Sequence, residues 1–123
     1  MLPYVRQLTR VLSKRLGWNR ARMKLMARLM RALPMQTTTN LAELAHAGKP
    51  EVETDSTYRR LQRFFAGFEF GYQRLGRFLL DLVPTDPPYV AVLDRTEWHF
   101  GQKAVNVLMI GIAKGGIAYP VAW

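Results

Sequence analysis

The chain has 123 residues, of which 49% are hydrophobic and 22% are charged, so it can form one hydrophobic core and is unlike a disordered polyelectrolyte. It has no cysteine and only two histidines, His46 and His99, which excludes a disulfide framework, a thiolate metal site and a histidine-rich zinc cluster. No apolar run reaches the roughly 18 to 20 residues that a transmembrane helix needs, and the N-terminus lacks the apolar segment of a secretory signal. These features predict a soluble, intracellular protein without a membrane partner.

Positive charge is concentrated in the first two thirds of the chain. The net charge is +9, and residues 1–88 hold fifteen Lys/Arg against seven Asp/Glu. Residues 1–33 hold nine basic residues and no acidic one, so ion pairs within that segment cannot neutralise it. Such a segment favours a polyanionic partner, above all nucleic acid, and an anionic membrane surface is the alternative.

Two helices are predicted at the N-terminus. Pro3 suits a first helical turn, and Gly17 follows the last residue of a helix that runs to Leu16. Asn19 is a suitable N-cap for a second helix, which we expect to end at Leu33 because Pro34 follows. We expect the apolar residues of this second helix to fill the core: Met23, Met26, Met30 and Leu33.

The second helix also carries basic residues at helical spacing on its other side. They are Arg20, Lys24, Arg28 and Arg31. We expect them to contact DNA phosphates, and a simply solvated face is the alternative interpretation.

A short helix and a longer basic helix follow. Asn40 and Glu43 have capping-box spacing, which predicts a short helix that ends near Gly48. A second helix over TYRRLQRFFAGF, capped by one of residues 54–56, would bury Tyr58, Leu61, Phe65 and Phe68 and expose Arg59, Arg60 and Arg63. The order is typical of a helix-turn-helix relative, although the expected connection is longer than usual. The three arginines are therefore our first candidates for DNA contact, and an ordinary helical hairpin is the alternative.

Residues 70–83 show helical spacing of apolar side chains, and we expect this fifth helix to complete a helical domain over residues 1–83. Residues 84–88 read PTDPP and contain three prolines, which predicts an extended linker and the domain boundary.

Residues 89–123 change from helical to extended periodicity. Residues 89–93 are a continuous apolar run that predicts a buried strand, with Asp94 at its end. A carboxylate there, at the rim of a sheet, can meet a metal ion or a ligand, and a structural aspartate in a turn is the alternative. Residues 104–113 are rich in β-branched side chains and predict a second strand, residues 114–116 (Lys-Gly-Gly) predict a turn, and residues 117–123 predict a third strand. The expected architecture is a three-stranded antiparallel meander in an α+β protein. Because a strand and no helix follows Gly115-Gly116, we exclude a phosphate-binding loop and a nucleotide cofactor.

One string within the meander carries a family resemblance. It reads D-R-T-x-W-x-F-G from Asp94 to Gly101, with Asn106 downstream and a third strand containing Ala-Tyr-Pro at residues 118–120. This string resembles the start of the catalytic domain of bacterial DDE transposases of the cut-and-paste insertion-sequence class. The segment YRRLQRFF, residues 58–65, is similar to the DNA-binding region of the same family.

The resemblance implies an RNase H-like fold and the chemistry of DNA transposition, which is DNA cleavage and strand transfer. Three carboxylates hold two Mg²⁺ or Mn²⁺ ions in such enzymes, and Asp94 matches the first of these metal ligands and catalytic residues. Arg95, Thr96, Trp98, Gly101 and Asn106 then shape or support the site. The implied partners are transposon ends and other transposase subunits, and the implied location is the bacterial cytoplasm on DNA.

The second aspartate and the glutamate of the family have no counterpart in residues 1–123. Glu97, Asp81 and Asp86 are not placed like carboxylates from another strand and helix. We therefore expect an N-terminal fragment from a truncated or frameshifted copy, limited to DNA binding and without metal-dependent cleavage. A small helix-turn-helix-like regulator is the principal alternative. A third possibility is an inhibitory partner that joins intact transposase subunits through the exposed edge of the strand YVAVL.

Overall fold

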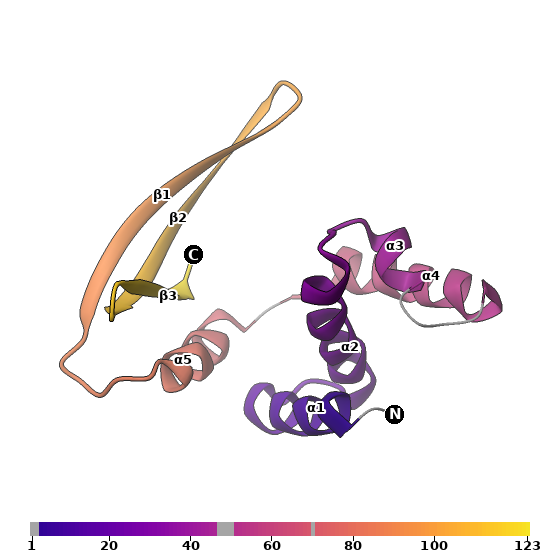
Figure 1. Ribbon diagram of the computed structural model, residues 1–123, viewed down its shortest axis with the longest axis horizontal. Coiled ribbons are helices and arrows are strands. Elements are labelled where there is room, and N and C mark those ends of the chain that lie inside the picture. The colour runs from indigo at the N-terminus through magenta and orange to yellow at the C-terminus, as the bar shows by residue number, and fades with distance from the viewer. Residues whose placement is uncertain (1–2, 47–50, 70) are drawn as a thin grey trace. The chain divides into compact units, whose positions relative to one another are not determined.

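The computed structural model describes residues 3–46, 51–69 and 71–123, and the chain divides into two compact units (Figure 1). The helical unit, residues 1–69, contains α1 (Pro3–Leu16), α2 (Arg20–Gln36), α3 (Leu41–His46) and α4 (Glu51–Gly67). The sheet unit, residues 70–123, contains α5 (Tyr72–Leu82), β1 (Val90–Phe100), β2 (Lys103–Lys114) and β3 (Ile117–Ala122). The expected α+β class and three-stranded antiparallel meander are confirmed.

Local sequence signals set the connection between α1 and α2. Gly17 adopts a left-handed φ of 67°, and its N–H donates to the carbonyl oxygen of Ser13 at 3.1 Å. A residue with a Cβ would be strained there, so glycine suits this end of α1. The side chain of Asn19 accepts a hydrogen bond from the N–H of Ala21 at 2.8 Å, which confirms the predicted cap.

The expectation that α2 ends before Pro34 is wrong. The helix includes Pro34 and continues to Gln36. Thr37 then takes a left-handed φ of 51°, and its N–H donates to the carbonyl oxygen of Leu33 at 3.0 Å. Because Pro34 lies in the last turn, it removes one helical hydrogen bond near an end, which the structure tolerates.

Close contacts between α1 and α2 form part of the core of the helical unit. Leu12, Leu16 and Met23 are its largest fully buried side chains. Thr9 is also buried, and its hydroxyl donates to the carbonyl oxygen of Val5 at 2.6 Å. Met30, expected in the core, is exposed, because Met23 and the small Ala27 take the closely packed positions of α2.

The predicted cap of α3 is confirmed with a different bonding pattern. The side chain of Asn40 accepts a hydrogen bond from the N–H of Ala42 at 3.0 Å. In a capping box, Glu43 would accept from the N–H of Asn40, but here the hydroxyl of Thr38 accepts that bond at 3.1 Å. Glu43 instead accepts from the side-chain amide of Asn40 at 3.5 Å.

The buried side of α4 also differs from the prediction. The helix begins at Glu51, before the expected caps at residues 54–56, and Thr54 is buried within it. Phe64 is buried and Phe65 is 55% exposed, the reverse of the expectation. The ring of Phe64 stacks on Phe68 with 4.5 Å between centroids, and Phe68 makes an edge contact with Trp18 at 4.4 Å. These ring contacts fix the rotation of α4 about its axis.

α5 belongs to the sheet unit, and the two units divide after residue 69. We had expected a helical domain over residues 1–83, with its boundary at residues 84–88. The helix packs on β3, and its Leu75 and Phe78 are buried. A Cβ added at Gly76 would lie 3.3 Å from the carbonyl oxygen of Val121. The missing side chain therefore lets α5 approach the backbone of β3, and the apolar side of this helix covers part of a sheet that would otherwise face water.

The sheet has the order β1-β2-β3 (Figure 1). β1 pairs with β2 without a register shift from Val90 opposite Ala113 to Phe100 opposite Lys103. A shift between Ile110 and Gly111 interrupts the pairing of β2 with β3. Asp94 therefore lies within β1 and not at its end, which corrects the prediction of a strand that ends at Leu93. The residues that follow it have alternating, strand-compatible side chains, so pairing with β2 extends to Phe100.

Candidate nucleic-acid interface

Three exposed arginines lie on α4 within one helical turn of each other. They are Arg59, Arg60 and Arg63, here called the arginine face of α4. Within the part of the chain that the structure describes, none of the three forms an ion pair. Free guanidinium groups at this spacing are suited to phosphate oxygens, which they contact through two parallel hydrogen bonds.

The local topology around this face resembles a helix-turn-helix arrangement. α3 is described to His46 and α4 from Glu51, and the two helices pack against each other. The connection that we expected to be longer than three or four residues falls on residues 47–50, which lie outside the described residues. α4 begins earlier than its predicted caps at residues 54–56.

The charge of the two units differs strongly. Residues 1–69 contain thirteen Lys/Arg and five Asp/Glu, whereas residues 70–123 contain five and four. The helical unit therefore carries almost all of the net positive charge. A potential of one sign over a small domain attracts polyanions and raises their rate of association.

Of the four basic residues of α2 predicted to contact DNA, three are less accessible than the arginines of α4. Arg20 is exposed, but Lys24, Arg28 and Arg31 are half-buried. Long basic side chains commonly lay their methylene groups along apolar surface and keep the charge in water. These residues can add to the potential of the helical unit, and they have less freedom than the arginine face of α4 to reach a phosphate.

The residues of the D-R-T-x-W-x-F-G string lie on both faces of the sheet. Because side chains alternate along a strand, Asp94, Thr96 and Trp98 share one face, here called the Asp94 face. Arg95 and Glu97 lie on the other, here called the Arg95 face, and Asn106 is opposite Glu97 on β2. The string is therefore not one constellation around Asp94.

A row of three ionisable groups on the Arg95 face was not predicted. Glu97 accepts a hydrogen bond from Arg95 at 3.2 Å between Oε2 and Nη2, and its other oxygen lies 2.7 Å from Nε2 of His99. All three side chains are exposed. The sequence signal for this row is the two-residue spacing of Arg95, Glu97 and His99, which puts their side chains on one face of a strand.

The last string residue, Gly101, serves the turn between β1 and β2. It has a φ of 61°, a left-handed conformation that glycine adopts without strain. The structure gives Gly101 this role in the hairpin, and its support of a site around Asp94 stays a prediction.

The described residues do not form the metal site that the resemblance implies. Asp94 is exposed, and one of its carboxylate oxygens accepts a hydrogen bond from the N–H of Arg95 at 2.9 Å. No group of three His, Cys, Asp or Glu in residues 3–46, 51–69 and 71–123 could hold a metal ion. The Asp94 face of the sheet holds no second carboxylate on β1, β2 or β3. A two-metal site needs several carboxylates, so this donor set does not fit it.

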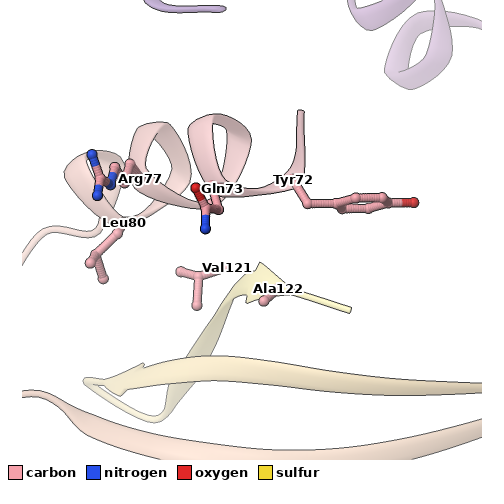
Figure 2. Close-up of a pocket in the computed structure, with 7 residues that line it drawn as sticks. Tyr72, Gln73, Arg77, Leu80, Val121 and Ala122 are labelled. Carbon is pink, nitrogen blue, oxygen red and sulfur yellow. The ribbon is translucent and has the colours of Figure 1, made fainter. Parts of the chain in front are cut away.

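A shallow groove of about 410 Å³ lies between α5 and β3 (Figure 2). Tyr72, Gln73, Arg77 and Leu80 line it from the helix, and Val121 and Ala122 line it from the strand. Sequence reasoning missed it because Gly76, which brings the two elements together, gave no signal of a long-range contact. Its lining is mainly apolar, with one guanidinium and one amide.

Comparisons of the chain with family models, with curated protein sequences and with solved structures found no match. In the described part of the chain, no helix combines the length and the apolar character needed to cross a bilayer.

Proposed function

We propose that this chain binds double-stranded DNA through α4, as the N-terminal part of a transposase of the DDE class. The observation that carries the DNA-binding proposal is the arginine face of α4, which is exposed and forms no ion pair among the described residues. It lies on the second helix of a helix-turn-helix-like pair in the unit that holds most of the positive charge. In such pairs the second helix enters the major groove.

The transposase assignment has separate support. A small regulator explains the charge and the helices, but not the string from Asp94 to Gly101. The three-stranded antiparallel meander that contains this string agrees with the start of an RNase H-like fold. The helix-turn-helix-like regulator remains the second candidate, because the order of α3 and α4 and the exposed arginines of α4 favour it equally.

The proposed activity is binding and not cleavage. One exposed carboxylate with water ligands holds Mg²⁺ weakly, and Asp94 is the single acidic residue on its face of the sheet. Phosphodiester cleavage with two metal ions would need further carboxylates near Asp94.

Binding to labelled DNA duplexes, followed by fluorescence anisotropy over a range of salt concentrations, tests this proposal. The test variant replaces Arg59, Arg60 and Arg63 with glutamine. Each lost phosphate contact should lower the slope of log affinity against log salt by about 0.9 and weaken binding to all duplexes. The matched control replaces three exposed basic residues of the sheet unit, Arg77, Lys103 and Lys114, and should bind like the unchanged chain.

Equal losses in the two triple variants would refute a specific role for α4, and salt-independent binding would refute phosphate contact altogether. Duplexes from both sides of the coding sequence separate the two candidates. A transposase should prefer the two ends of its element, whereas an autoregulator should prefer the upstream side alone.

A further inference from the structure

The two outer strands of the sheet differ in how their free edges are protected. β3 is six residues long, contains Pro120 and has α5 packed against it. β1 is eleven residues long, pairs without interruption, and contains neither proline nor lysine. Proline, bulges, short length, charged side chains and cover by a helix are the usual protections of an edge strand. Of these, the described residues of β1 show only the charged side chains, so its edge is open to a strand whose charges complement Asp94, Arg95 and Glu97. The structure therefore leaves one edge available for pairing.

We infer that a second copy of this chain pairs with β1, antiparallel and about a two-fold axis, to give a six-stranded sheet. Protection of β3 restricts the addition to one side, and an isologous contact of this kind closes at two copies. This inference does not depend on DNA binding by α4, because it uses residues of the sheet unit alone.

Among the registers centred on residues 94–97, where the charged side chains of β1 lie, charge complementarity selects one. A two-fold axis normal to the sheet keeps each face on one side, so the axis must lie midway between one residue of β1 and the same residue of the second copy; an axis through a residue means an axis in this position. An axis through Asp94 would place two carboxylates opposite each other, one through Arg95 would oppose two guanidinium groups, and one through Glu97 would again oppose two carboxylates. Like charges directly opposite are unfavourable.

An axis through Thr96 avoids all of these conflicts. It puts Arg95 of each copy opposite Glu97 of the other, so the ion pair that each chain already makes at 3.2 Å is extended across the dimer. Thr96 then lies opposite Thr96 of the second copy. On the Asp94 face, Val92 of each copy lies opposite Phe100 of the other. Threonine pairs, opposite charges and aromatic pairs with β-branched residues are all favourable cross-strand neighbours.

Sedimentation equilibrium of the full chain at micromolar concentration should show a dimer. Arg95→Glu and Glu97→Arg each place like charges at both cross-strand positions. With roughly 1 kcal/mol for each altered pair, the dimer dissociation constant should rise about thirtyfold. An equimolar mixture of the two variants places opposite charges at both positions and should restore the dimer. Both residues are exposed, so circular dichroism should show unchanged folding.

A cysteine cross-link tests the register directly, because the chain has no cysteine of its own. Thr96→Cys should form a disulfide-linked dimer under mild oxidation, since the two residues meet at the axis. The matched control Val92→Cys lies on the same strand and face, but away from its copy, and should cross-link far more slowly.

A monomeric unchanged chain would overturn the inference, as would charge variants that dimerise normally or a mixture that fails to associate. Faster cross-linking of Val92→Cys or Asp94→Cys than of Thr96→Cys would overturn the register and with it the charge argument.

Discussion

The helical unit and the sheet unit treat apolar side chains in opposite ways. The helical unit buries Leu12, Leu16 and Met23 almost completely between its helices. The sheet unit exposes Trp98 and Phe100 on one face of its hairpin and Leu93 and Leu108 on the other. Apolar residues thus form a closed core in the helical unit and an exposed surface in the sheet unit.

The difference follows from what covers each element. Helices α1 to α4 contact one another in series, so each apolar side has a partner. In the sheet unit α5 packs on β3, at the edge opposite β1, and most side chains of the long β1–β2 hairpin are exposed. Exposed apolar surface of this kind typically marks an interaction site or a liability to aggregation. The surface of the sheet unit is therefore where we expect partners other than DNA.

The largest expected effect compares two leucines. Leu12→Ala should lower the free energy of unfolding of the helical unit by about 2–5 kcal/mol, because it leaves a cavity between α1 and α2. Leu108→Ala on the exposed hairpin should cost less than about 0.5 kcal/mol. Urea denaturation followed by circular dichroism measures both. Similar losses at the two positions would show that the hairpin is as well covered as the helical core.

A smaller effect is expected at the contact of α5 with β3. Gly76→Leu should cost about 1–3 kcal/mol, because its side chain must displace the backbone of β3 or the helix. Hydrogen–deuterium exchange should show faster exchange in β3 and unchanged exchange in α1 and α2. The matched control is Gly67→Leu in α4, where an added Cβ meets no atom within 4 Å, and β3 should exchange normally in it. Unchanged protection of β3 in the Gly76 variant would contradict the close packing.

The smallest effect is expected at the cap of α2. Asn19→Ala removes the acceptor of the Ala21 N–H and should destabilise the helical unit by about 1 kcal/mol. Asn19→Asp keeps an acceptor at the cap and should retain most of the stability. Urea denaturation of the two variants tests this, and exchange in β1 and β2 should not change. An aspartate variant as unstable as the alanine variant would point to a role of Asn19 other than capping.

Local signals in the sequence were sufficient for much of the fold. Gly17 and Asn19 mark the junction of α1 and α2, Asn40 marks the start of α3, and the change to extended periodicity after residue 89 predicts the meander. These features depend on backbone conformation and on hydrogen bonds between residues close in the chain, so a short window of sequence contains their cause. The exposed positions of Arg59, Arg60 and Arg63 were predicted on the same basis.

The tertiary structure decided which of several possible partners each element took. Sequence spacing placed Phe65 in the core, whereas the contacts of Phe68 with Trp18 and Phe64 select Phe64. Likewise α5 is amphipathic in either unit, and the approach of Gly76 to Val121 assigns it to the sheet. Asp94 was expected at the end of a strand, but pairing with β2 extends β1 past it and separates the motif over two faces. Each outcome depends on contacts between residues distant in the chain, which local periodicity does not encode.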